Sequence, residues 1–273
     1  MKSASWAKCS AHTVVTICLL LGTAIIWYLD PLPQPSNYHD LPDQRTLFGL
    51  PNGMDVLTNV PYLLVSGIAL VAVGVQYHAS RNLSAVFLYG CFFLATASTS
   101  ITSSLYHVAP SNLTLIGDRI SIVIAAASLM GIASLNPFGA LEGLKITGIA
   151  VIYGLWSLFY WYQTSTSPSE NILFYVFFQI CVLCFAAYCC IMRRQFAMSY
   201  KWVAFAIAAY VLSKPFEVYD SEFFEITNGL ISGHSMKHLI IVFSVFALLI
   251  HMLESASDAL TRVEERHEQD LSK

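Results

Sequence analysis

Charged residues are scarce in this sequence. Asp, Glu, Lys and Arg together make up 11% of the 273 residues, whereas soluble domains carry about 25%. The net charge is only −3, which provides no cationic surface for a nucleic-acid partner. Hydrophobic residues make up 56% of the chain, and the mean hydropathy is +0.61. These values exclude an ordinary soluble domain and favour a membrane protein.

Two further features are lacking. The seven cysteines are odd in number and lie mostly in apolar stretches, so no disulfide framework is predicted. Cys181 and Cys184 have a C-x-x-C spacing, but within an apolar run we interpret them as small packing residues. The ten-residue alternating segments of a membrane β-barrel are also missing, which leaves helices as the spanning elements.

Long apolar runs are what the sequence does contain. A helix needs about 20 residues to cross the hydrocarbon core, and eight runs approach or exceed that length. The seventh is the shortest and ends at Lys214-Pro215. We therefore predict an all-α polytopic membrane protein with spans at 12–29, 55–76, 84–106, 117–135, 143–162, 170–191, 200–213 and 235–253.

The distribution of Lys and Arg predicts the orientation, because cytoplasmic loops are enriched in both. With the N-terminus inside, ten of these residues are cytoplasmic and four are exoplasmic; the opposite orientation inverts the ratio. We therefore expect both termini in the cytoplasm and an uncleaved first span. The cytoplasmic set is Lys2, Lys8, Arg81, Lys145, Arg193, Arg194, Lys201, Arg262, Arg266 and Lys273; the exoplasmic set is Arg45, Arg119, Lys214 and Lys237.

Two polar clusters fall on the exoplasmic side of this topology. Ser103 and His107 end the third span four residues apart, and Asp118 opens the fourth. His234 and His238 have the same four-residue spacing at the start of the eighth span. Ionisable groups in a membrane are costly and tend to face a cavity or one another. Three imidazoles with one open position are typical of a catalytic zinc site.

A zinc ion would give roles to the two remaining residues of the clusters. Asp118 would accept and return a proton, and Ser103 would hydrogen-bond an oxyanion or hold the water. The alternatives are an ion pair of Asp118 with Arg119 or Lys237, and a Ser103 hydroxyl bonded to its own helix.

The motifs Ser103-x-x-x-His107, Asp118 and His234-x-x-x-His238 resemble, in order and spacing, the signature of the alkaline ceramidase family. That family belongs to the CREST superfamily of seven-span intramembrane hydrolases. The stretches 43–64, SSLYHVAPSN…GDR and SGHSMKHL are similar to bacterial-type members, over about residues 43–253. The resemblance implies zinc held by the three histidines, with Asp118 and Ser103 as catalytic partners. The implied reaction is hydrolysis of ceramide to a sphingoid base and a fatty acid.

The resemblance also implies a division of the chain. Residues 1–35 would form an N-terminal transmembrane anchor and linker, 36–253 a seven-helix ceramidase-like core, and 254–273 a charged cytoplasmic tail. The active site would lie toward the exoplasmic face, in the inner membrane if the organism is bacterial. Substrate lipid would enter laterally from the outer half of the bilayer.

Animal members of the family also have a calcium site before and within the first core helix. Asp43, Asn52, Asp55 and Asn59 are partly similar to it, but Arg45 stands where another acidic ligand is expected. A cation at this position is able to pair with Asp55 and replace the ion, so calcium is not the favoured cofactor. Asp43, Arg45, Asn52 and Asp55 are candidates for a second metal site or an ion-pair site.

Two other functions fit the composition. One is a lipid-sensing receptor of the same superfamily, in which the zinc is structural. The other is a membrane transporter or metal channel, although that would require polar groups along the full depth of several spans, and the spans at 55–76 and 170–191 are poor in charge.

Overall fold

The computed structural model of the chain describes residues 10–79, 82–192 and 197–271. Lys2, Lys8, Arg81, Arg193, Arg194 and Lys273 of the charge count lie outside these ranges. All regular structure within them is helical, apart from one isolated bridge between Leu47 and Leu50. The helices are α1 (Ala11–Ile26), α2 (Gly53–Leu57), α3 (Val60–Ala79), α4 (Leu83–Val108), α5 (Asn112–Phe138), α6 (Ala140–Thr164), α7 (Leu173–Met192), α8 (Ala197–Val218), α9 (Asp220–Ile226) and α10 (Gly233–Leu271).

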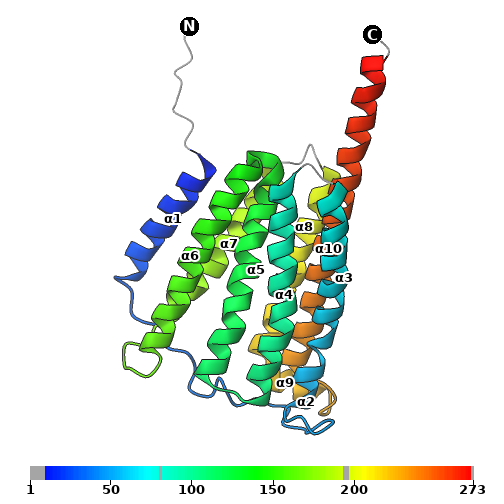
Figure 1. Cartoon of the computed structure of the whole chain (residues 1–273). Helices are drawn as coiled ribbons and strands as arrows, with labels where there is room; N and C mark the ends of the chain where they lie inside the picture. The colour runs from blue at the N-terminus through cyan, green and yellow to red at the C-terminus, as the bar shows by residue number, and fades with distance from the viewer. Residues whose placement is uncertain (1–9, 80–81, 193–196, 272–273) are drawn as a thin grey trace.

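The long helices run side by side as a bundle, with α1 packed outside α6 and α7 (Figure 1). Within the described ranges, six segments are long and apolar enough to cross a membrane: 53–77, α4, α5, α6, α7 and 233–257. The predicted class, an all-α polytopic membrane protein, is thereby confirmed. The other two predicted spans are also helices, but α1 has only 16 residues, and α8 includes Lys201, Lys214 and Glu217.

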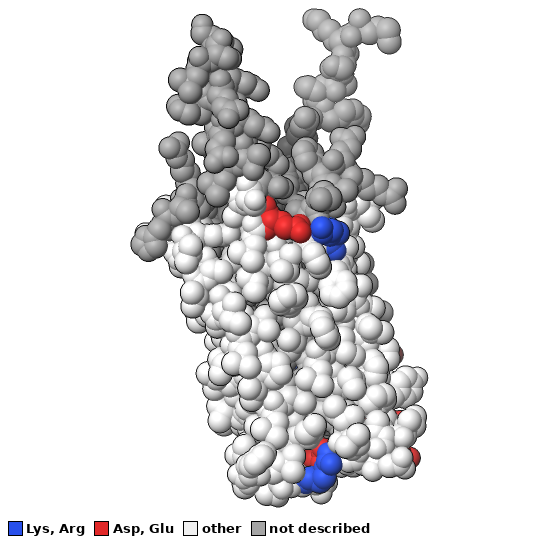
Figure 2. Space-filling model, turned by 90° about the vertical axis from the view of Figure 1, so that its right-hand side faces the viewer, with Lys and Arg blue, Asp and Glu red and all other residues white. Residues whose placement is uncertain are grey.

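Most charged atoms on one face of the bundle lie away from its middle. The face in Figure 2 has a broad uncharged band, and its Lys, Arg, Asp and Glu atoms gather toward the two ends. A helix that crosses hydrocarbon can keep charged groups only near its ends or in its interior. The start of α1 and the end of α10 lie at one end of the bundle, while α2 and α9 lie at the other (Figure 1).

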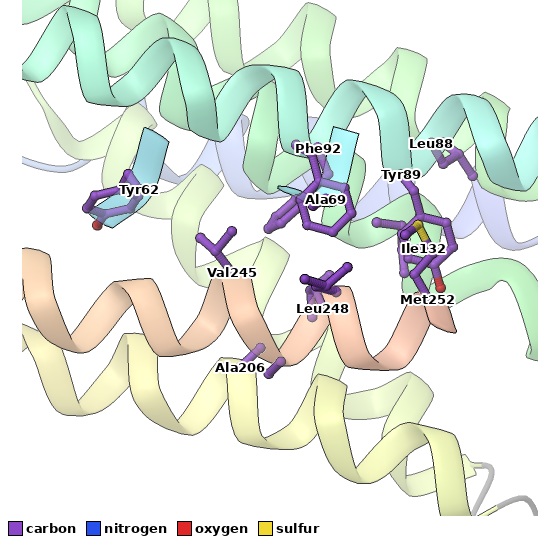
Figure 3. Close-up of a cluster of buried hydrophobic side chains, with 13 residues drawn as sticks. Tyr62, Ala69, Leu88, Tyr89, Phe92, Ile132, Ala206, Val245, Leu248 and Met252 are labelled. Atoms are coloured by element: carbon purple, nitrogen blue, oxygen red, sulfur yellow. The ribbon is translucent and has the colours of Figure 1, made fainter. Parts of the chain in front are cut away.

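A buried cluster packs α3, α4, α8 and α10 together (Figure 3). It is built from large apolar side chains interleaved with small ones, which lets the helices approach closely. Phe93, Leu88 and Leu248 are fully buried in it, and Ala69 and Ala247 are its small members. Helix α3 packs against both α4 and α10, so this cluster helps to set the relative position of the two helices that carry the predicted histidines.

Two helix boundaries differ from the predictions in ways that matter for the site. Helix α5 begins at Asn112 rather than at 117, because the Ser111 hydroxyl accepts a hydrogen bond from the Thr114 amide and caps it. Asp118 therefore lies in the second turn and does not open the helix. Helix α8 continues through Pro215 to Val218, as membrane helices with neighbours to support them often do.

Candidate metal centre

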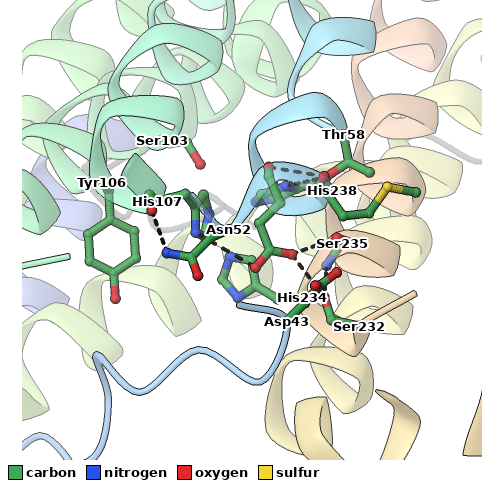
Figure 4. A network of polar contacts seen from close by, with 12 residues as sticks. Asp43, Asn52, Thr58, Ser103, Tyr106, His107, Ser232, His234, Ser235 and His238 are labelled. Carbon is green, nitrogen blue, oxygen red and sulfur yellow. Dashed lines mark hydrogen bonds and ion pairs between the residues drawn. The ribbon is translucent and has the colours of Figure 1, made fainter. Parts of the chain in front are cut away.

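Three histidines from two distant parts of the chain meet at the end of the bundle that holds α2 and α9 (Figure 4). His107 lies in the last turn of α4, and His234 and His238 lie in the first turns of α10. One ring nitrogen of each lies within 4.8 Å of the others. The ring centroids of His107 and His234 are 4.7 Å apart, and those of His107 and His238 are 5.2 Å apart.

The unpaired nitrogens of this cluster suit a metal ion. His107 is fully buried, and neither of its ring nitrogens has a hydrogen-bond partner within the described ranges. His238 Nδ1 is bonded to the Thr58 hydroxyl at 3.0 Å, which leaves Nε2 as its ligand atom. Buried polar atoms are rarely left unpaired. Zn–N bonds of about 2.0–2.1 Å in a tetrahedral site place the ligand nitrogens roughly 3.4 Å apart, and the three nitrogens here lie within 4.8 Å of one another.

Asp55, in α2, lies behind His107. Its Oδ1 accepts hydrogen bonds from Ser232 at 2.8 Å and Ser235 at 2.5 Å. Its Oδ2 has no hydrogen-bond partner in the described chain and lies 4.0 Å from His107 Nδ1. A carboxylate that hydrogen-bonds a ligating imidazole orients the ring and fixes its tautomer; here the two atoms face each other beyond hydrogen-bond distance and would have to approach by about 1 Å.

Ser103 lies one turn before His107 and is 3% exposed. Its hydroxyl oxygen accepts a hydrogen bond from the Asn59 side-chain amide at 3.1 Å. This partner lies between α2 and α3 rather than in the helix of Ser103, and the catalytic role of Ser103 stays a prediction.

Asp118 has one carboxylate oxygen, Oδ1, that is buried without a partner within the described residues. Neither proposed ion pair forms among those residues. Lys237 Nζ instead binds Glu217 at 2.9 Å, and the Arg119 guanidinium stacks over Trp161 at 4.3 Å.

The predicted pairing of Arg45 with Asp55 is wrong. Arg45 Nε donates to Asp43 Oδ1 at 2.7 Å, and Nη2 binds the other oxygen of the same carboxylate. Asp43 lies only two residues away and also accepts the Arg45 backbone N–H, so the local turn brings these two groups together. Asn52 binds the His107 carbonyl at 2.7 Å. Asp43, Asn52 and Asp55 therefore have separate partners.

A cavity of about 750 Å³ adjoins the histidines. His234, His238, Ser103 and Asp118 all line it. The part near the histidines carries polar and charged side chains together with six linker residues: Pro35, Asn37, Tyr38, Asp40, Leu41 and Pro42. The part toward the middle of the bundle is mostly apolar, with Phe92, Leu129, Val182, Leu183, Ile207 and Leu248 among its lining residues, although Thr96, Gln179 and Ser244 also line the cavity.

Sequence reasoning missed Thr58, Ser232 and Ser235. Ser232 lies just before α10 and Ser235 lies in its first turn, and this spacing was a usable signal, because two hydroxyls at a helix start can donate to one carboxylate. Thr58 gave no signal, because its contact joins positions 180 residues apart. A search of protein-family models and a search of curated proteins each found no match to this chain.

Proposed function

We propose that this protein is a zinc-dependent intramembrane amide hydrolase that cleaves ceramide or a related N-acyl sphingoid lipid. The carrying observation is the buried three-histidine cluster beside a cavity whose wall includes Ser103 and Asp118. The resemblance of these motifs to the bacterial-type alkaline ceramidases supports the choice of reaction. A zinc ion held by the three imidazoles would supply Lewis acidity toward the amide carbonyl and lower the pKa of water.

The side chains around the cluster would handle the protons and the substrate oxygen. Asp118 Oδ1, which has no partner among the described residues, accepts a proton from water and returns it to the departing amine. The Ser103 oxygen already accepts from Asn59, so its own O–H is available to donate to the carbonyl oxygen as negative charge develops. Both groups line the same cavity.

The cavity suits a long-chain amide. Its volume of about 750 Å³ lies within the 300–1,000 Å³ that is typical of small-molecule sites. The apolar deeper part would hold an alkyl chain away from water, while the polar outer part would hold the head of the lipid. With both termini in the cytoplasm, this outer part faces the exoplasmic side, and the lipid enters laterally from that leaflet.

The proposal is tested with purified full-length protein in nanodiscs. We expect about one zinc per chain, fatty-acid release from ceramides in a panel of N-acyl lipids, loss of release after treatment with a chelator, and recovery when zinc is restored. Stoichiometric zinc without turnover of any lipid would instead support the receptor. A protein that contains no stoichiometric zinc and hydrolyses no lipid would support the transporter or channel.

Asp55→Asn tests whether the buried carboxylate orients His107. Asparagine can still accept from Ser232 and Ser235 through its oxygen, but it places a donor where Oδ2 faces His107 Nδ1. We expect zinc affinity to fall about 10- to 100-fold, measured by competition with a chelator of known affinity. Asp43→Asn is the matched control, since Asp43 is equally buried but pairs with Arg45. Unchanged affinity in Asp55→Asn would remove this role.

A further inference from the structure

Arg119, in α5, is a buried cation with no acidic partner. It is 5% exposed, and no carboxylate of the described chain lies within ion-pair distance of it. Its Nη2 donates to the Gln34 side-chain oxygen at 2.7 Å. Its Nη1 is buried and has no hydrogen-bond partner among the described residues.

Three aromatic rings surround the guanidinium. Its carbon lies 4.3 Å from the centroid of Trp161, 5.3 Å from that of Tyr38 and 5.4 Å from that of Tyr175. The ring faces attract the positive charge but accept no conventional hydrogen bond from its edge. Arginine stays protonated in proteins, and its planar fork matches a carboxylate in two-point geometry. A buried guanidinium with an unused N–H edge is therefore suited to an anionic ligand.

The position of Arg119 points to the lipid as the source of that anion. Arg119 lines the same cavity as Asp118, His234 and His238. Two other cations line it, and both are already paired: Lys214 and Lys237 bind the two oxygens of Glu217 at 2.8 and 2.9 Å. Of the three, Arg119 alone lacks an ionic partner in the described chain.

We propose that Arg119 binds a carboxylate, or a chemically similar anion, on the amine side of the amide lipid. This rests on the proposed amide hydrolysis, and it extends the substrate class from neutral N-acyl sphingoid lipids to N-acyl amino-acid lipids and other anionic N-acyl lipids. The alkyl chain would occupy the apolar part of the cavity, and the anion would bind the unpaired Nη1 of Arg119.

Two ligands separate this proposal from simple chain binding. N-oleoylglycine and N-oleoylethanolamine share an acyl chain and an amide. N-oleoylglycine ends in a carboxylate, whereas N-oleoylethanolamine ends in a neutral hydroxymethyl group. We would measure their equilibrium binding to full-length protein in nanodiscs, in the Asp118→Asn background so that neither lipid is consumed. This measurement needs no turnover, so a failure of the proposed hydrolysis leaves it interpretable.

We expect N-oleoylglycine to bind at least about 10-fold more tightly than N-oleoylethanolamine, since a hydrogen bond between two charged groups is stronger than one to a neutral hydroxyl. Arg119→Gln should abolish this preference, and Arg119→Lys should retain part of it. Lys145→Gln, which removes an exposed cation that does not line the cavity, should leave it unchanged.

Equal affinity for the two lipids in protein that retains Arg119 would overturn the proposal. This outcome does not depend on whether any Arg119 variant folds. A preference that survives in Arg119→Gln would overturn it as well. Oleate is the third ligand to be measured. If Arg119→Gln weakens the binding of oleate but not of N-oleoylglycine, the site binds the fatty-acid product, and the assignment of Arg119 to the lipid head is wrong.

Discussion

Replacing His238 with alanine is expected to abolish bound zinc and lipid hydrolysis together. His238 supplies one of three clustered ring nitrogens, and its Nδ1 is already bonded to Thr58. Alanine removes the ligand and leaves two imidazoles, too few to hold a catalytic zinc site that uses three protein ligands. Zinc content should fall from about one per chain to near zero by elemental analysis, and fatty-acid release should fall to background.

A second histidine on the same helix provides the control. His251 is 2% exposed and pairs with Tyr89 at 2.6 Å, away from the cluster. His251→Gln changes a buried imidazole on α10 without touching a ligand, so zinc content should be retained. If His238→Ala keeps its zinc and its activity, the three-histidine centre is not the reactive site.

Asp118→Asn should keep zinc and lose turnover. Asp118 is not among the three clustered ligands, so the ion does not depend on it. Asparagine cannot accept the proton, and the loss of a positioned general base costs about 10²- to 10⁴-fold in rate. The check is kcat with ceramide, or with the best lipid of the panel, together with zinc content of the same preparation.

Asp40→Asn is the matched control for this substitution. Asp40 also lines the cavity, and the change removes the same charge, but Asp40 is exposed in the linker. Its activity should stay close to that of the unaltered protein. Normal ceramide hydrolysis by Asp118→Asn would show that the proton acceptor is another group.

The helices and the histidine cluster were predictable from sequence because each depends on local or one-dimensional information. The lengths of the apolar runs predicted the spanning helices. The distribution of Lys and Arg predicted that His107, His234 and His238 lie at the same depth in the membrane. The structure brings all three together. Helix ends were less predictable. The start of α5 depends on the Ser111 cap, and the passage of α8 through Pro215 depends on neighbouring helices.

Long-range polar partners were beyond the reach of sequence spacing. The resemblance to a calcium site suggested Arg45 as the partner of Asp55, yet the hydroxyl partners of Asp55, Ser232 and Ser235, lie 177 and 180 residues away. Arg45 took the nearer Asp43. Such choices depend on which side chains the folded bundle brings within about 3 Å, and periodicity carries no information about that.

The five-residue helix α2 and the residue before it are hydrogen-bonded to both histidine-bearing helices, α4 and α10, so these contacts need no bound ion. Asn52, just before it, holds the last turn of α4 through the His107 carbonyl, and Asp55 holds the start of α10 through two hydroxyls. This bracket preorganises the coordination sphere, because the ends of α4 and α10 are fixed without help from an ion. Metal uptake should therefore require little ordering of the backbone, and an emptied centre should reload without refolding.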